Sequence, residues 1–246
     1  MRLYEHPKLR PLEIWHGQTS QGSLFKVAED YLDLALFEFL SKLYRGTATV
    51  LYESDQSALV HAKNFKTLYL AGGKAQLIFK KLANTDLPFD IKLIEDLTCL
   101  YAYDVTIDWG QTTIKCYTPK GKQVWQRDLN QFPIRCSTSP QNISNTDSKI
   151  KIRNQFSKLL GQSSPKKIGL ALPLKMDHQL NAEPSTYEGL EGNLKNLFAG
   201  ITNADIEFMN DAVLTARQIY EQNHLVPGKS LIVTLGYGVG AALWDE

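Results

Sequence analysis

Four short stretches of this sequence combine residue types that could bind a phosphate or move a proton. In the first, TIDWGQTT, Asp108 ends an apolar run and Gly110 opens a turn that leads to two threonines. A carboxylate there can hold a hydrated Mg²⁺ ion, and the backbone amides of a glycine turn can approach phosphate oxygens. The same residues also suit an ordinary hairpin turn, because Asp and Gly are common at strand ends. This stretch alone leaves both interpretations open.

The second stretch, VTLGYGVGAALW, has glycines at alternate positions: Gly236, Gly238 and Gly240. Glycine lets the backbone approach a phosphate closely, but the pattern is also typical of a hairpin with a β-bulge. The dinucleotide fingerprint is a poor match, because its third glycine comes one residue later and opens a helix that receives the pyrophosphate.

Two further stretches place polar or small residues between a strand and a helix. In LYLAGGKAQL, Gly72 and Gly73 could admit a nucleotide or could simply pack the connection. In IEFMNDAVLTARQIYEQ, Asn210 ends an expected strand and Asp211 opens an expected helix, so N-capping alone is a sufficient explanation for both. Each stretch alone is ambiguous between a functional and a purely structural interpretation. The occurrence of all four in one sequence favours the functional interpretation.

The periodicity of apolar residues predicts alternating strands and helices, which is typical of α/β architecture. The expected helices are 24–44, a helix after Gly73, a short helix after residue 94, 149–160, 190–199 and 211–221. The expected strands are 66–70, 91–94, a three-stranded meander that begins near residue 104, 167–172, 206–209 and a final strand that runs into Gly236.

The composition indicates an ordinary globular protein, with 43% hydrophobic and 22% charged residues. A net charge of +1 argues against binding to nucleic acid or to an anionic membrane. Cys99, Cys116 and Cys136 are widely spaced, which predicts neither a disulfide framework nor a zinc site. This cysteine usage indicates a reducing compartment, so we expect a cytoplasmic protein. No run approaches the roughly 18 to 20 apolar residues of a membrane span.

Taken together, the four stretches resemble motifs of the actin-like ATPase and sugar kinase superfamily, most closely its ROK family of sugar kinases and repressors. DWGQT at 108–112 resembles the first phosphate loop of that family, Asp-x-Gly-Gly-Thr, and TLGYGVGAAL resembles its second, Gly-Thr-Gly-Ile-Gly. IGLALPLKMD at 168–177 is similar to its Ile-Gly-x-x-x-Pro-Gly-x-x-Asp segment, and MNDAVLTARQIYE is similar to its Asn-Asp-Ala helix. The four occur in the family's order.

The order of the remaining motifs resembles a circular permutation. In the family, a Glu-Ile-Gly-His sugar contact and an adenosine loop with a glycine pair follow the second phosphate loop. Here LEIWHGQT, with Glu13 and His16, and LYLAGGKA, with Gly72 and Gly73, precede the first phosphate loop. The resemblance therefore implies that the two ends of the chain are neighbours, with the cut between Trp244 and Glu13.

The resemblance implies a two-lobed α/β fold of the actin-like ATPase (ribonuclease H-like) type, with nucleotide and sugar in the cleft between the lobes. The first lobe, 104–210, would hold the first phosphate loop and its sheet. The second lobe, 1–103 with 211–246, would hold the sugar-contacting Glu and His, the adenosine loop, the catalytic helix and the second phosphate loop.

The implied activity is ATP-dependent phosphoryl transfer to a sugar hydroxyl, with Asp211 as the general base and Asp108 orienting Mg²⁺ through water. The implied partners are a sugar and ATP, without nucleic acid or membrane, and a homodimer is left open. The implied sugar contacts are Asn210, Glu13 and His16, and the implied nucleotide contacts are Asp108, Gly110, Gln111, Thr112, Thr113, Gly236, Tyr237, Gly238, Gly72 and Gly73.

Several features depart from the family pattern. Gln111 and Leu174 each replace a glycine, Trp15 replaces the glycine before the histidine, and the family's Cys-rich zinc loop is absent. The Gln111 and Leu174 departures support an alternative, a catalytically weak nucleotide- or sugar-binding pseudokinase or regulator. A DNA-binding repressor is a third hypothesis, which the near-neutral charge and the lack of a preceding helix-turn-helix disfavour.

Overall fold

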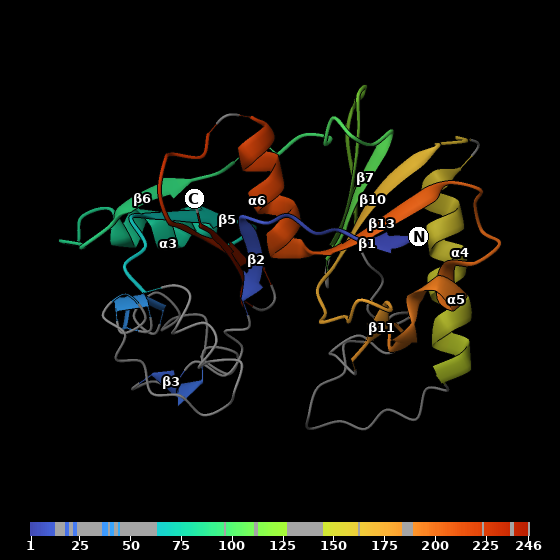
Figure 1. Cartoon of the computed structure of the whole chain (residues 1–246), viewed down its shortest axis with the longest axis horizontal. Coiled ribbons are helices and arrows are strands. Elements are labelled where there is room, and N and C mark those ends of the chain that lie inside the picture. The colour runs from blue at the N-terminus through green and yellow to red at the C-terminus, as the bar shows by residue number, and fades with distance from the viewer. Residues whose placement is uncertain are drawn as a thin grey trace. The chain divides into compact units, whose positions relative to one another are not determined.

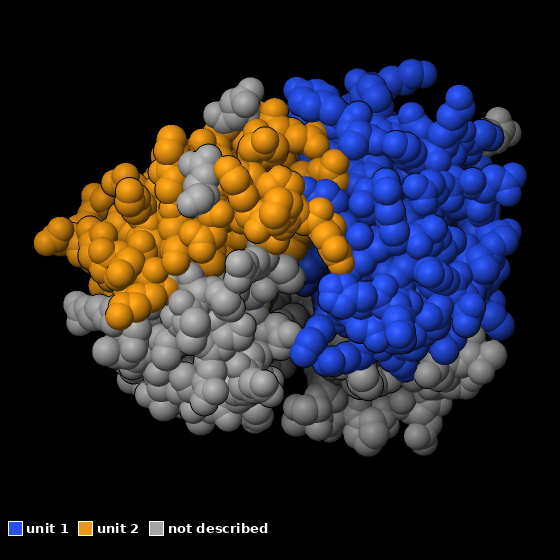
Figure 2. Space-filling view, viewed as in Figure 1, with its two compact units in different colours: residues 1–4, 98–211 blue, residues 5–97, 212–246 orange. Residues whose placement is uncertain are grey.

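The computed structural model divides the chain into two compact units, which Figure 2 colours separately. Unit 1 comprises residues 1–4 and 98–211, and unit 2 comprises 5–97 and 212–246. The expected boundaries were at residues 104 and 211, whereas the units change at 5, 98 and 212, so that residues 1–4 belong to unit 1. The structure describes residues 1–12, 18–19, 22–23, 36–38, 40–41, 44, 63–95, 97–110, 113–126, 145–161, 163–183, 189–222, 224–236 and 239–245.

Unit 1 is built on a mixed sheet with the strand order β1-β13-β10-β7-β8-β9. The first four strands in this order are parallel to one another, and β7, β8 and β9 form an antiparallel meander. The strands are β1 (Arg2–Leu3), β7 (Val105–Trp109), β8 (Thr113–Thr118), β9 (Gly121–Gln126), β10 (Lys167–Leu172) and β13 (Asp205–Asn210).

One face of this sheet is covered by α4 (Asn145–Leu160) and α5 (Leu194–Phe198), and Figure 1 shows α4 running alongside it. Because side chains alternate along a strand, every second residue points into this core. Ile107, Leu170 and Phe208 are fully buried there, together with Phe156 and Phe198 of the helices. Burial of this apolar face is the main favourable term in folding the unit.

Unit 2 has a sheet with the strand order β2-β15-β14-β5-β6. β14, β5 and β6 are parallel, while β15 is antiparallel to both β14 and β2. Its elements are β2 (Leu9–Leu12), β5 (Thr67–Ala71), α3 (Ala75–Leu82), β6 (Asp90–Leu93), β14 (Ser230–Leu235) and β15 (Val239–Trp244), and α6 (Asp211–Glu221) enters it from unit 1. Each unit also has a small two-stranded sheet. In unit 2, β3 (Gln18–Thr19) pairs with β4 (Gly22–Ser23), and in unit 1, β11 (Asn181–Ala182) pairs with β12 (Gly192–Asn193).

The two large sheets share one spatial order and one set of strand directions. In unit 1 the order β9-β8-β7-β10-β13 consists of two antiparallel pairings followed by two parallel ones. In unit 2 the order β2-β15-β14-β5-β6 repeats that pattern. Thus β14 corresponds to β7, β15 to β8, β2 to β9, β5 to β10 and β6 to β13. Along the chain, however, β2 comes first in unit 2 and β15 comes last.

Early and late residues of the chain are neighbours within unit 2, as expected. β2 pairs with β15, with Leu9 opposite Trp244. The Asp245 N–H also donates a hydrogen bond to the Lys8 carbonyl oxygen at 2.8 Å. The sheet of unit 2 is therefore complete only when residues from both ends of the chain are present.

Most expected elements occur in the structure, and the α/β class is confirmed. The strand at 167–172 and the helix at 211–221 have the expected bounds, and the meander is present. The short helix after residue 94 is wrong, because the described residues 97–103 hold no helix and the Thr106 hydroxyl instead accepts the Leu100 N–H at 3.2 Å. The expected helix at 190–199 begins only at Leu194, where the Asn193 side chain accepts the Asn196 N–H.

Among the described residues, no helix combines the length and the hydropathy needed to cross a bilayer.

Of the expected helix at 24–44, the described residues 36–38, 40–41 and 44 are helical. Leu36 and Leu40 from this segment are fully buried in the core of unit 2, which also contains Ile78 of α3.

An aromatic stack joins the two chain ends to α6. The His6 ring stacks on Trp244 with ring centroids 5.1 Å apart, and Trp244 stacks on Tyr220 at 4.8 Å. The His6 Nδ1 atom accepts the Lys8 N–H at 3.1 Å. Burial, and then the positive charges of Arg217 and Lys8, lower the pKa of His6 from its ordinary value of 6.5.

We expect this histidine to make the protein less stable in mild acid. A folded-state pKa below the unfolded value means that the unfolded chain binds the proton more readily, so stability is lost as pH falls below 6.5. His6→Asn should flatten this part of the stability profile, measured by urea unfolding between about pH 5 and pH 8. His178→Asn, at an exposed position, is the matched control. If His6→Asn follows the wild-type profile, another group controls the acid response.

Candidate functional site

The carboxyl ends of three parallel strands bring several of the expected site residues to one edge of unit 1. Asp108 on β7 pairs with Ala171 on β10, and Ala171 in turn pairs with Met209 on β13. Asn210 follows as the last residue of β13, and Asp211 opens α6. Open α/β sheets bind their ligands at the carboxyl ends of their strands. This edge is therefore the candidate site of unit 1.

Asp108 is held by a lysine that the sequence analysis did not single out. The Lys115 Nζ atom lies 2.8 Å from the Asp108 Oδ2 atom, in an ion pair whose side chains are 27% and 16% exposed. The two residues are directly opposite each other on β7 and β8, so their side chains share one face of the sheet. The sequence could have indicated this pairing. In a hairpin centred between positions 111 and 112, position 108 is opposite position 115.

Tyr117 lies on the same face of the sheet as this ion pair. Burial, and then the negative charge of Asp108, raise the pKa of Tyr117 far above its ordinary value of 10.0. A phenol carries no positive charge in either of its protonation states, so Tyr117 cannot balance the carboxylate. The charge of Asp108 is met by the Lys115 ammonium group at hydrogen-bond distance.

The turn after β7 needs a glycine for reasons internal to the protein. A Cβ atom at Gly110 would lie 2.7 Å from the Thr113 carbonyl oxygen, which is closer than van der Waals contact allows. The stretch is thus a hairpin, one of the two interpretations of the sequence, and Thr113 begins β8. Gln111 and Thr112 lie outside the described residues, as do Glu13 and His16.

Unit 2 brings its expected nucleotide residues to the equivalent edge. β5 and β14 are parallel neighbours, so Gly72 and Gly73 after β5 lie beside Gly236 after β14. Gly72 has a φ of +99°, and a Cβ atom there would lie 2.6 Å from the Leu235 carbonyl oxygen. That same oxygen accepts the Lys74 N–H at 3.1 Å. Gly72 is therefore required by the close approach of the two strand ends.

Gly73 and Gly236 differ from Gly72, because among the described residues, chain neighbours aside, no atom lies within 4 Å of a Cβ atom built on either of them. The described surroundings give no steric reason for glycine at these two positions. Open space beside bare backbone is what a closely approaching nucleotide would need, so these residues fit that ligand. Tyr237 and Gly238 lie outside the described residues.

Asn210 and Asp211 are both half-buried at the junction of β13 and α6. Asp211 lies in the first turn of α6, where the helix dipole favours a carboxylate. Its position thus suits a structural role, and it also places the carboxylate on the same sheet edge as Asp108. Among the described residues, no group of three or more His, Cys, Asp or Glu side chains could hold a metal ion.

The segment that resembles the Pro-Gly loop contributes packing in this protein. Leu174, which replaces the glycine, is 3% exposed and belongs to the core of unit 1. A Cβ atom at Gly169 would lie 2.9 Å from the Tyr103 ring, so that glycine admits an aromatic side chain. A cavity of about 300 Å³ follows this segment, lined by Lys175, Met176, Asp177, Asn181, Ala182 and Glu183.

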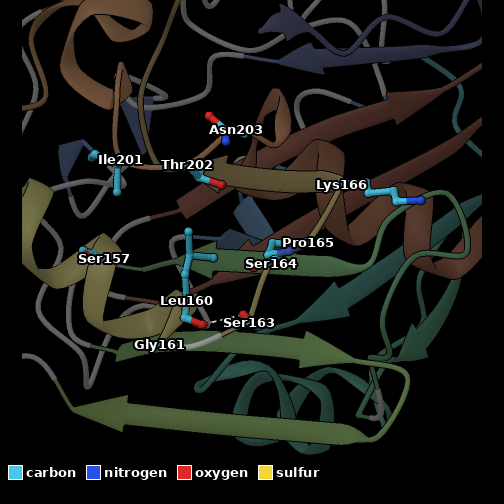
Figure 3. Close-up of a pocket in the computed structure, with 10 residues that line it drawn as sticks. All are labelled: Ser157, Leu160, Gly161, Ser163, Ser164, Pro165, Lys166, Ile201, Thr202 and Asn203. Carbon is cyan, nitrogen blue, oxygen red and sulfur yellow. Dashed lines mark hydrogen bonds between the residues drawn. The ribbon is translucent and has the colours of Figure 1, made fainter.

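A larger cavity, of about 450 Å³, lies at the opposite edge of the sheet of unit 1, where β10 and β13 begin. Figure 3 shows its wall, in which the end of α4 faces the segment before β13 and Ser163 is hydrogen-bonded to Leu160. None of the expected site residues lines it. Its lining is Ser157, Leu160, Gly161, Ser163, Ser164, Pro165, Lys166, Ile201, Thr202 and Asn203.

No protein-family model matches the sequence, and no curated protein matches it either. The resemblance to the ROK family therefore rests on the motifs themselves, and the positions of their residues in the structure provide an independent basis for a proposal.

The contrast between the two glycines of the pair gives a stability prediction. Gly72→Ala should lower the free energy of unfolding by about 2–4 kcal/mol, because it combines a strained φ with a backbone clash. Gly73→Ala, in open space one residue later, is the matched control and should change it by less than about 0.5 kcal/mol. Urea unfolding of both variants tests this, and equal losses would show that the approach of Leu235 is not the cause.

Proposed function

We propose that this protein is an ATP-dependent sugar kinase that resembles the ROK family. One observation carries the proposal: the two stretches that resemble phosphate loops occupy equivalent places in two sheets of the same strand order. The Gly110 turn joins β7 to β8, and the Gly236 turn joins the corresponding β14 to β15. Two unrelated hairpins would have no reason to correspond in this way.

We also propose that the fold is a two-lobed actin-like ATPase fold in circularly permuted form. The strand order supports this, because joining the end of β15 to the start of β2 would give unit 2 the same chain order as unit 1. It would then read β14, β15, β2, β5 and β6, as unit 1 reads β7, β8, β9, β10 and β13. The pairing of Leu9 with Trp244 places those two ends in adjacent strands.

In the proposed reaction, a sugar hydroxyl oxygen attacks the γ-phosphorus of ATP, the bond to the bridging oxygen breaks, and ADP leaves. Asp211 accepts the hydroxyl proton, and Asn210 beside it holds a sugar hydroxyl, with Glu13 and His16 as further sugar contacts. Backbone amides near Gly110 and Gly236 hold phosphate oxygens, and Gly72 and Gly73 border the adenosine. Such a reaction requires positioning and charge balance more than covalent chemistry from the protein.

Mg²⁺, when bound with the nucleotide, would neutralise phosphate charge during transfer. Asp108 is the carboxylate that precedes the Gly110 turn of unit 1, and one carboxylate together with phosphate oxygens is a common way to hold this ion. The donor chemistry therefore fits a metal that arrives with ATP, and Asp108 would orient it through water.

A second candidate function is a catalytically weak nucleotide- or sugar-binding regulator. The ion pair between Asp108 and Lys115 favours it, because it occupies the carboxylate that the metal would need. The replacement of two family glycines by Gln111 and the buried Leu174 points the same way.

Release of ADP against a panel of sugars separates the two candidates. The proposed kinase releases ADP with at least one sugar, and Asp211→Asn should lower kcat about 10²- to 10⁴-fold because the general base is lost. Asp147→Asn, in the first turn of α4, is the matched control for an acidic residue that opens a helix, and it should keep full activity. Thermal stabilisation by ATP or a sugar without ADP release would instead support the regulator.

The open glycines provide a test of nucleotide binding. Gly73→Val and Gly236→Val should each weaken ADP binding by about tenfold or more, because a side chain would fill the space that the nucleotide needs, at about 1.4 kcal/mol per tenfold. Calorimetric titration with ADP measures this. Leu77→Val, at an exposed position on α3, is the control, and unchanged ADP affinity in both glycine variants would contradict the assignment.

A further inference from the structure

We infer that Lys115 is an internal counter-ion that competes with a divalent cation for Asp108, so that the unliganded protein holds no metal at this edge. This deepens the proposed function, on which it rests for the nature of the ligand, a metal-bound phosphate anion. Lys115 then acts as a positioning residue that makes cation binding depend on the arrival of the anion.

The geometry of the ion pair is the first step. Asp108 and Lys115 are paired across β7 and β8, and the Nζ and Oδ2 atoms are 2.8 Å apart. Both residues are in regular strands, so their Cα positions are fixed by backbone hydrogen bonds on either side. The lysine therefore meets the carboxylate without any rearrangement of the sheet.

The surroundings of Asp108 are the second step. Its neighbour on β10 is Ala171, whose methyl group offers the carboxylate no donor. Thr106 and Tyr117 share its face of the sheet, and both are uncharged. The opposite face, which carries Ile107 and Trp109, belongs to the buried core. Lys115 is thus the cation that the described neighbours on β7, β8 and β10 present to this carboxylate.

The electrostatics give the third step. A hydrated divalent cation and an ammonium group repel each other, so both cannot lie against one carboxylate without a further negative charge. A single carboxylate also holds Mg²⁺ weakly, because this ion usually needs phosphate oxygens as well. Lys115 therefore remains paired with Asp108 until a bound anion attracts the ammonium group and the ion pair dissociates.

Paramagnetic broadening by Mn²⁺ in the nucleotide-free protein tests the inference, since it detects weak binding near particular amides. In Lys115→Met, Mn²⁺ should selectively broaden the amide signals of residues 107–110 and 114–116. Half-broadening should require on the order of tenfold less Mn²⁺ than in the wild type, because removing the ammonium group at 2.8 Å from the carboxylate also removes its repulsion of the cation. The double variant Lys115→Met/Asp108→Asn should lose the effect.

Two controls separate competition from structural damage. Lys115→Arg keeps the positive charge and should behave like the wild type, and Lys175→Met removes a lysine from the exposed ion pair with Glu183. Amide dispersion of each variant verifies its fold. Equal broadening in the wild type and Lys115→Met, or broadening that survives Asp108→Asn, would overturn the inference. Because the experiment contains neither nucleotide nor sugar, its result is independent of ADP release, which decides the proposed function.

Discussion

The parallel pairing of β10 between β7 and β13 is the constraint on which the candidate site depends. Parallel strands end at the same edge, and the alternation of side chains decides which of their last residues face the core. Ile107, Leu170 and Phe208 point into the core, so Asp108 must point to the other face. A shift of register by one residue would bury the carboxylate among aromatic side chains, so the same apolar packing that stabilises unit 1 also fixes its charge at the edge.

The sequence indicates local structure well, because strand and helix signals are local. The strand at 167–172 and the helix at 211–221 follow from apolar periodicity and from the Asn210–Asp211 start signal. The short helix after residue 94 was predicted wrongly because the backbone N–H of Leu100, which a helix would use in its own hydrogen bonds, is donated to the Thr106 hydroxyl. Local periodicity contains no information about that partner.

The candidate site is less predictable than the elements that form it. The closeness of Gly72 to Leu235 depends on the parallel pairing of β5 with β14, which are far apart in the chain. The resemblance to family motifs predicted that the glycine stretches after β5 and β14 belong to one site. It contains no information on the contrast between Gly72, which the Leu235 backbone requires to be glycine, and Gly73, which faces open space among the described residues. The position of Lys115 opposite Asp108 is set by the register of the hairpin, and Lys115 belongs to none of the motifs.

The two corresponding sheets differ in charge at one equivalent position. Thr234 pairs with Ala71 and Gly240, as Asp108 pairs with Ala171 and Lys115. The same position in the strand order therefore carries an ion pair in one unit and a hydroxyl opposite a glycine in the other. The Thr234 hydroxyl is buried and has no hydrogen-bond partner among the described residues. The two hairpins thus have the same strand pairings but differ in charge at this position, and a carboxylate attracts a cation more strongly than a hydroxyl group does.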